Sequence, residues 1–425
     1  MSRALPAPAR PILGIDFGTT NSVVAMRDAD GTLRYLRLAA DDPVFRTVLC
    51  FWAEESRAGR RLAHAAGPRA IAAYLDDPLD SRLILSMKTY LAQKSFTRTD
   101  IFGRPFTLER LVALFLAALL GDAAKDAAIT AGRPVRFAGD FADDAHGEAR
   151  LRAAFAEAGF PAIDIALEPE AAGYRFARTL DRPATVLIGD FGGGTSDFSI
   201  LRFDPAAAHA VTPLGYAGIG LAGDQFDFRI LDRVVAPRLG KHDHYTVMGQ
   251  RLPVPAEYFA GFARWHRLSL MRTPRMLRDI ASVAASADQP ALLLHLIRLI
   301  EDEMGYPLYR AVSEAKAALS SAEETVLRFA HGDFVLEERI TRADFEAWIA
   351  EDLARMGASI DRALADAGLG AGAIDRVFLT GGTAFVPAVR ALFADRFGAA
   401  RISGGGEFVS VAEGLALIGA DRARG

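Results

Sequence analysis

One short acidic pattern occurs twice in this chain, and it constrains the fold more than any other feature. Residues 12–25 read ILGIDFGTTNSVVA, and residues 186–201 read VLIGDFGGGTSDFSIL. Each is an apolar run that ends in an aspartate, followed by a small polar turn and a second apolar run. Aligning Asp16 with Asp190 superposes the two segments across 174 residues, far more than the period of a solenoid. We therefore predict a duplicated lobe in which each copy offers one acidic hairpin to a shared cleft.

The glycine-rich turns have the composition that a phosphate site needs. Phosphate binds to backbone N–H donors, and only small residues let the chain approach closely. Thr19, Thr20 and Thr195 add hydroxyl donors. An aspartate ahead of each turn would repel bare phosphate, so we expect a cation between them. A hydrated magnesium ion, which keeps its waters and takes few carboxylates, fits between Asp16 and Asp190.

Either turn taken alone is also compatible with an ordinary glycine-rich β-turn. The matched pair, together with a third glycine turn at 381–383 in VFLTGGTAFVPAVRALF, favours a phosphate site. Short β-branched runs alternate with Ala/Leu/Arg-rich runs along the chain, which predicts the α/β class. The elements we expect are hairpins over 11–28 and 182–203, helices over 107–125 and 145–159, and a stretch from 236 to about 310 that is irregular at first and then helical.

Length, charge and cysteine content narrow the function classes. A chain of 425 residues exceeds one ordinary domain, and its net charge of -4 argues against a nucleic-acid partner. The single cysteine, Cys50, indicates a reducing compartment. The apolar runs at 111–120 and 291–300 are too short to cross a bilayer and predict buried helices. We expect a cytoplasmic protein with no membrane partner.

Three further patterns carry less weight. GIGLAG at 218–223 matches a dinucleotide-binding pattern, but no clean apolar strand precedes it, so we interpret it as a loop. DFG occurs twice without the other protein-kinase motifs. His242 and His244 lack further metal ligands nearby in the sequence, which favours a solvated loop.

Taken together, the motifs resemble those of the actin–hexokinase–heat-shock ATPase superfamily, and they are most similar to the nucleotide-binding domain of the DnaK-like heat-shock 70 kDa family. They follow the family's order along essentially the whole chain: GIDFGTTNS, SMKTYLAQKSF at 86–96, LEPEAAGYRFA at 167–177, DFGGGTSDFSIL, GLAGDQFDFRIL at 220–231, EAKAALSS at 314–321 and LTGGTAFVPAV. The resemblance implies an α/β, actin-like ATPase fold with two duplicated, ribonuclease H-like lobes around a central nucleotide cleft. It also implies ATP or ADP and Mg²⁺ as cofactors.

The resemblance assigns a role to each matching residue. Lys88 would contact the γ-phosphate and orient the attacking water, while Glu168 and Asp197 would position that water. Asp16 and Asp190 would hold magnesium through water. The contacts to the phosphates would come from Gly18, Thr19, Thr20, Asn21, Gly192, Gly193, Gly194 and Thr195. Thr195 would also be a catalytic group. The contacts to the adenosine would come from Gly223, Lys316, Ser320, Gly381, Gly382 and Thr383.

The chain departs from the family pattern around the adenine. Ala317 replaces an arginine whose guanidinium would stack on the base. Ser313 replaces an acid, although neighbouring Glu314 could substitute for it. Phe385 replaces a second arginine and offers an aromatic face instead. These changes make phosphate binding a firmer expectation than base specificity.

The expected domains are lobe I at 1–183, closed by a C-terminal helix at about 404–425, and lobe II at 184–403 with an elaborated subdomain at about 224–313. Only 42 residues follow Thr383, too few for a peptide-binding domain, which resembles a short, YegD-like branch of the family. The resemblance implies a slow, chaperone-like ATPase that acts as a nucleotide-dependent switch, with a protein partner or nucleotide-exchange factor. Two alternatives stay open: a small-molecule kinase of the same superfamily, and a nucleotide-gated scaffold or filament protein.

Overall fold

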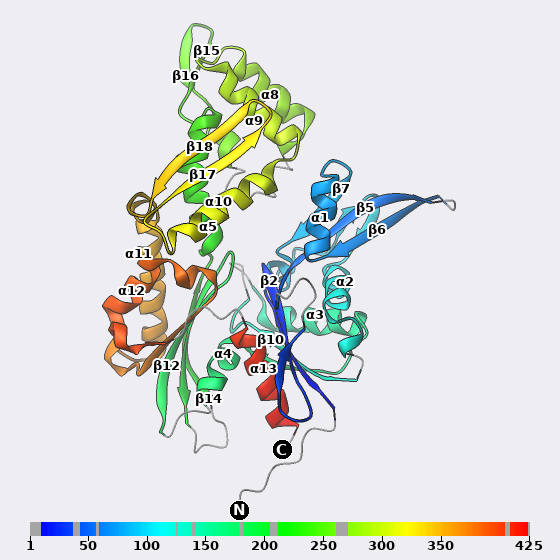
Figure 1. The fold of residues 1–425 in the computed structure, drawn as a ribbon, viewed down its shortest axis with the longest axis vertical. Coiled ribbons are helices and arrows are strands. Elements are labelled where there is room, and N and C mark those ends of the chain that lie inside the picture. Colours follow the sequence, from blue (N-terminus) through cyan, green and yellow to red (C-terminus); the bar gives the residue numbers. More distant parts are fainter. Residues whose placement is uncertain are drawn as a thin grey trace, which may run out of the picture. The chain divides into compact units, whose positions relative to one another are not determined.

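The computed structural model of the chain describes residues 10–36, 43–56, 59–124, 126–137, 142–177, 182–204, 211–260, 271–403 and 409–423 (Figure 1). The chain forms two compact units, of which the first comprises Met1–Gly220, Met356–Ala384 and Ala391–Gly425, and the second Leu221–Arg355 and Phe385–Arg390. This partition by compactness does not test the predicted division into lobes, which stays a prediction.

The first sheet of the first unit is built on the first acidic hairpin. Its strands are β1 (Ile12–Phe17), β2 (Asn21–Arg27), β3 (Leu33–Tyr35), β4 (Val44–Arg46), β10 (Ala128–Arg133) and β11 (Ile163–Leu167). The order is β11-β10-β1-β2-β3, with β4 also pairing with β2. β1 runs parallel to β10 and antiparallel to β2, which confirms the predicted hairpin over 11–28.

The second sheet repeats this topology on the second acidic hairpin. Its strands are β12 (Ala184–Phe191), β13 (Ser196–Phe203), β14 (Val211–Ile219), β19 (Arg376–Thr380) and β20 (Ile402–Ser403). The order is β20-β19-β12-β13-β14, again with parallel strands on one side of the hairpin and antiparallel strands on the other. The shared order and directions agree with a duplicated lobe and confirm the hairpin predicted over 182–203.

Two helices of the first unit pack between these sheets. α13 (Ser410–Arg422) lies against β1, β2 and β10, and α4 (Glu168–Ala177) contacts both α13 and β12 (Figure 1). The helices approach closely because glycine stands at their contact. A Cβ atom at Gly414 would overlap the carbonyl oxygen of Ala171.

The rest of the first unit surrounds a core cluster in which Phe17 and Phe45 pack on Phe115. Its helices α2 (Leu108–Leu120) and α3 (Asp144–Glu157) confirm the two helices predicted there, each shorter than expected. The remaining elements are β5 (Val48–Ser56), β6 (Gly59–Ala66), α1 (Pro68–Asp76), β7 (Ser81–Leu85), η1 (Met87–Tyr90), β8 (Thr99–Ile101), β9 (Arg104–Phe106), η2 (Gly121–Ala124), η7 (Ala371–Ala373) and η9 (Ala399–Arg401).

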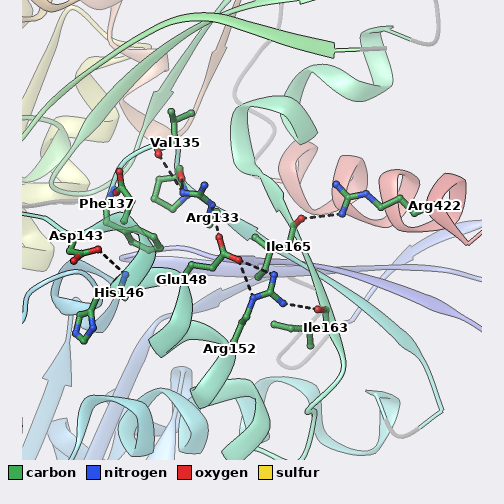
Figure 2. A network of polar contacts seen from close by, with 12 residues as sticks. Arg133, Val135, Phe137, Asp143, His146, Glu148, Arg152, Ile163, Ile165 and Arg422 are labelled. Carbon is green, nitrogen blue, oxygen red and sulfur yellow. Dashed lines mark hydrogen bonds and ion pairs between the residues drawn. The ribbon is translucent and has the colours of Figure 1, made fainter. Parts of the chain in front are cut away.

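Arginine side chains cover carbonyl groups of β11, the edge strand of the first sheet (Figure 2). Arg152 on α3 donates to the carbonyl oxygen of Ile163 at 3.0 Å, and Arg422 on α13 donates to that of Ile165 at 3.0 Å. Glu148 accepts from Arg152 in turn. Unpaired edge carbonyls are a template for strand addition, so these contacts protect the edge.

The second unit combines a helical layer with two hairpins. Its elements are α5 (Gly223–Ile230), the π-helix η3 (Leu231–Val235), η4 (Ala236–Leu239), β15 (His244–Val247), β16 (Gln250–Pro253), α6 (Glu257–Ala260), α8 (Pro274–Ala284), α9 (Pro290–Glu301), α10 (Gly305–Leu319), β17 (Glu324–His331) and β18 (Phe334–Thr341). α10 packs on α5 and β17. The chain passes between units within α11 (Arg342–Asp366) and again through η8 (Gly382–Phe385) and α12 (Pro387–Phe397).

Two sequence predictions were wrong. The stretch after residue 236 is not irregular, because β15 and β16 form a hairpin whose turn has Met248 at φ 48° and Gly249 at φ 73°. The usual signal for such a turn is Asn-Gly or Asp-Gly, and Met248 stands where the asparagine or aspartate would be. The pattern at 218–223 is not a plain loop, since β14 ends at Ile219 and α5 begins at Gly223. β14 contains Pro213, Gly215 and Gly218, which weaken its strand pattern, and its pairing with β13 makes it a strand. In the described ranges, no helix is both long and apolar enough to cross a membrane.

Candidate functional site

The two predicted metal carboxylates occupy equivalent positions in the two sheets of the first unit. Asp16 is the penultimate residue of β1, and Asp190 is the penultimate residue of β12. Each is partly buried in a strand that is otherwise buried. Both strands also pair with a parallel neighbour, and the carboxyl ends of such strands are where α/β folds place their ligands.

The first glycine turn follows β1, the second follows β12 and the third follows β19. Backbone atoms approach closely at each turn. In the second turn, the N–H of Gly192 donates to the carbonyl oxygen of Thr195 at 2.9 Å. In the first, a Cβ atom at Gly18 would overlap the carbonyl oxygen of Asn21. In the third, Gly381 has φ 89°, and a Cβ atom there would overlap the carbonyl oxygen of Phe191. The third turn therefore lies against the end of β12.

Lys88 and Glu168 form an ion pair that is almost fully buried. The Lys88 Nζ lies 2.7 Å from Glu168 Oε1, and the side chains are 13% and 6% exposed. Lys88 is carried by the 3-10 helix η1, while Glu168 is the first residue of α4, directly after β11. Gly132 at the end of β10 makes room for the acid, because a Cβ atom there would come within 2.8 Å of Glu168 Cγ. The structure thus brings together two residues that are 80 positions apart.

Arg150, which the sequence analysis did not single out, fixes the segment that carries Lys88. Its guanidinium donates to Glu109 and to the carbonyl oxygens of Tyr90 at 3.3 Å and Gln93 at 3.4 Å. The side chain is only 7% exposed. No short-range pattern signals this role, because α3 must first fold against the segment after η1.

The acidic groups of the first unit interact electrostatically. Burial and repulsion from Glu168 raise the pKa of Asp16 to about 7, against an attraction to Lys88. The same two causes, burial first, raise the pKa of Asp190 well above its ordinary value. Burial raises the pKa of Asp197 to about 6. Burial alone would lower the pKa of Lys88, but its attraction to Glu168 and Asp16 prevails and raises it.

Asp197 accepts a hydrogen bond from a tyrosine that the sequence analysis also missed. The Tyr216 hydroxyl on β14 donates to Asp197 Oδ1. Asp197 is the second residue of β13 and lies opposite Asp190 in the antiparallel register. Burial, followed by the proximity of Asp197, raises the pKa of Tyr216, so the phenol stays protonated and donates.

The remaining predicted adenosine residues belong to the second unit. Gly223 is the first residue of α5, and Ser320 is the C-cap that directly follows the last residue of α10. Lys316 donates to the carbonyl oxygen of Gly223 at 3.0 Å and to Asp227 Oδ2 at 2.8 Å, where Asp227 is fully buried. Lys316 is thus engaged by a carboxylate.

The neighbouring departures from the family pattern also lie on the second unit. Glu314 pairs with Arg310 on the exposed face of α10. Ala317 is exposed, and Phe385 is 43% exposed.

The predicted magnesium site can be compared with the possible metal ligands in the described part of the chain. There, no three His, Cys, Asp or Glu side chains are arranged to hold a metal ion. The predicted coordination needs no such group, because it uses two carboxylates acting through water. Asp16 and Asp190 as magnesium residues therefore stay a prediction.

Comparison with known proteins shows what this chain is similar to. The family model described as "Hsp70 protein" matches residues 298–420. The chain is also similar to three proteins named chaperone protein DnaK: 26% identity to that of Thermus thermophilus over 396 residues, 27% to that of Deinococcus radiodurans over 413, and 28% to that of Thermotoga maritima over 398. By these matches the chain is similar to Hsp70 proteins.

The two sheets of equal topology agree with the actin-like ATPase fold that the similarity to Hsp70 proteins implies. The matches cover 91% of this chain and 55–57% of the relatives, so the chain spans little more than half the length of those DnaK proteins. The predicted YegD-like branch stays a prediction.

Proposed function

We propose that this chain, which is similar to Hsp70 proteins, binds Mg·ATP or Mg·ADP and hydrolyses ATP slowly, as a nucleotide-dependent switch. The observation that carries the proposal is the interacting set formed by Asp16, Glu168, Asp190 and Asp197 with Lys88. Such a set lowers stability unless a ligand compensates its charge, and perturbed groups of this kind gather at functional sites.

The donor set fits a hard divalent cation. Three of its carboxyl groups have a raised pKa because they are buried among other acids, and Lys88 supplies a single opposing charge. Carboxylate oxygens suit magnesium, which retains its waters in protein sites. Asp16 and Asp190 would hold it through those waters. When bound, the ion would offset the negative charge of the phosphates.

The glycine turns would bind the phosphates. Gly18 and Gly192 let their turns fold back closely on Asn21 and Thr195, and tight turns of this kind bind anions through N–H groups that the turn itself leaves free. The hydroxyls of Thr19, Thr20 and Thr195 are further donors. These contacts would position the chain of phosphates before any bond is broken.

Lys88 and the two acids would carry the hydrolytic step. The Lys88 ammonium, held by Glu168, would stabilise charge on the γ-phosphoryl group as it transfers. Asp197 would orient a water so that its oxygen bonds to the γ-phosphorus while the bond to the β,γ-bridging oxygen breaks. The products are ADP and inorganic phosphate, which takes up the proton released by the water.

The nucleoside contacts that we propose on the second unit are Gly223, Lys316 and Ser320. On the first unit we propose Gly381, Gly382 and Thr383. Because Lys316 already bonds Asp227, we expect it to contribute through a fixed ammonium rather than a mobile one. Ala317 and Phe385 in place of guanidinium groups predict a weaker preference for adenine.

We also propose a chaperone-like role, because the similar proteins are named chaperone proteins, and we propose that the chain acts in the cytoplasm. The nucleotide state would control the surfaces of the chain toward a protein partner or a nucleotide-exchange factor. We propose no membrane or nucleic-acid partner.

Single-turnover hydrolysis tests the proposal. Excess protein is mixed with labelled ATP and Mg²⁺, and the wild type is compared with Lys88→Ala after binding has been measured for both. We expect cleavage in the wild type, and cleavage about 100-fold slower in Lys88→Ala with nucleotide binding retained. A wild type that binds Mg·ATP without cleaving it would contradict the ATPase part and leave a nucleotide-gated scaffold.

A further inference from the structure

Tyr216 reaches Asp197 from the neighbouring strand by a specific cross-strand arrangement. On β14, Gly218 lies directly opposite Asp197 in the register, and Tyr216 lies opposite Ser199. Tyr216 and Gly218 are two residues apart, so they share one face of the strand. The tyrosine side chain extends along that face and donates its hydroxyl to Asp197 Oδ1.

Gly218 leaves the space in which this pair meets. A Cβ atom at Gly218 would lie 2.5 Å from the Tyr216 hydroxyl oxygen and 2.7 Å from Asp197 Oδ1. Both distances are shorter than a van der Waals contact, so any larger residue would push the pair apart. The absence of a side chain at position 218 is therefore a requirement of the Tyr216–Asp197 hydrogen bond.

Tyr216 is held at its other groups as well. Its backbone N–H donates to Asp366 Oδ2 at 2.9 Å, and the guanidinium carbon of Arg136 lies 5.8 Å from the centre of its ring. A cation at that distance over an aromatic face is attracted to it. Three contacts thus fix Tyr216: one at its backbone N–H, one on its ring face and one at its hydroxyl.

We propose that Tyr216 is a positioning residue for hydrolysis, which holds the Asp197 carboxylate in the orientation that aligns the attacking water. This inference rests on the proposed function, because it assigns to Asp197 the role of orienting that water. The hydroxyl of Tyr216 occupies Oδ1, and the Thr195 side chain also bonds this carboxylate. With these two bonds made, the carboxylate cannot rotate freely, and its remaining lone pairs keep fixed directions in which they would accept from the attacking water.

The test compares Tyr216→Phe, which removes one hydroxyl, with a matched control. Tyr35→Phe is that control, because the Tyr35 hydroxyl donates in the same way to Glu413, outside the acidic set. For each variant, the Kd for Mg·ATP and the single-turnover rate constant for cleavage are measured separately. We expect Tyr216→Phe to cleave about tenfold more slowly with its Kd within about twofold of the wild type. Tyr35→Phe should cleave at the wild-type rate.

Two further variants separate positioning from a structural role. Gly218→Ala keeps both polar groups but forces them apart, so its cleavage should slow at least as much as that of Tyr216→Phe. In an Asp197→Asn background, Tyr216→Phe should cost nothing more, because it acts through that carboxylate.

The outcomes separate failure of the inference from failure of the proposed function. Wild-type cleavage with an unchanged rate in both Tyr216→Phe and Gly218→Ala would overturn the inference and leave the ATPase intact. A loss confined to nucleotide affinity or thermal stability would overturn it too. Binding without cleavage in the wild type would remove the proposed hydrolysis and the inference together.

Discussion

Replacing Arg150 by methionine tests how the segment that carries Lys88 is held. The change keeps an unbranched apolar stem but removes every donor, so Glu109 and the carbonyls of Tyr90 and Gln93 lose the hydrogen bonds that Arg150 gives them. Removing one partner of a buried ion pair costs about 3–5 kcal/mol. Glu109 is 25% exposed and can recruit water, and the two carbonyl contacts are long, so we expect the lower end, about 3 kcal/mol.

Urea unfolding at pH 7, followed by circular dichroism, measures this free energy of unfolding. The control is Arg152→Met on the same helix, where a 45% exposed arginine pairs with Glu148. We expect that change to cost about 0.5 kcal/mol. Hydrogen exchange of the amides at 88–93 should also accelerate in Arg150→Met alone. A loss below about 1 kcal/mol with unchanged exchange at 88–93 would refute the reasoning.

The same pair predicts a pH dependence. Burial opposes ionisation of Glu109, but the hydrogen bond from Arg150 prevails, so the pKa of Glu109 in the folded protein lies below 4.5. A lowered carboxyl pKa stabilises the fold above the unfolded-state value, and this stabilisation is lost as pH falls through the folded-state value. The difference in unfolding free energy between wild type and Arg150→Met should therefore shrink below pH 4.5.

Two further changes test packing and charge elsewhere. Gly414→Ala places a Cβ atom onto the carbonyl oxygen of Ala171 and should lower the free energy of unfolding in urea by about 2–3 kcal/mol. The control is Gly372→Ala, which has open space around it and should cost less than about 0.5 kcal/mol. Equal effects would contradict the close packing of α13 on α4. Lys316→Met removes the cation that pairs with the fully buried Asp227, so it should lower the thermal unfolding midpoint of the second unit by several degrees. An unchanged midpoint would contradict a stabilising role of this ion pair.

The parts of the fold that depend on local patterns could be predicted from the sequence. The two acidic hairpins and the helices at α2 and α3 follow from alternation, glycine turns and apolar periodicity. The hairpin of β15 and β16 could not, because its turn uses Met248 in a conformation that non-glycine residues seldom adopt. β14 was missed because its strand character comes from pairing with β13 rather than from its own residues.

The candidate site, too, could be predicted only where local motifs determine it. The motifs predict Asp16, Lys88 and Glu168, and the structure brings Lys88 against Glu168. Arg150 and Tyr216 could not be predicted, since each acts across a contact between distant segments. Gly218 was visible in the sequence, but only as part of a misleading glycine pattern. Its role appears once the register places it opposite a carboxylate.

The central claim is that the two acidic hairpins bind the phosphates of one nucleotide, with a magnesium ion held between Asp16 and Asp190. Calorimetric titration of ATP, with Mg²⁺ and with EDTA, tests it on the wild type and on the double variant Asp16→Asn/Asp190→Asn. Removing two mutually repelling acids should leave the variant at least as stable as the wild type in EDTA, so folding is not in question. We predict that Mg²⁺ tightens ATP binding at least tenfold in the wild type and has no effect on the variant. Equal binding with and without Mg²⁺ in the wild type, or a variant that keeps the full Mg²⁺ effect, would contradict the account.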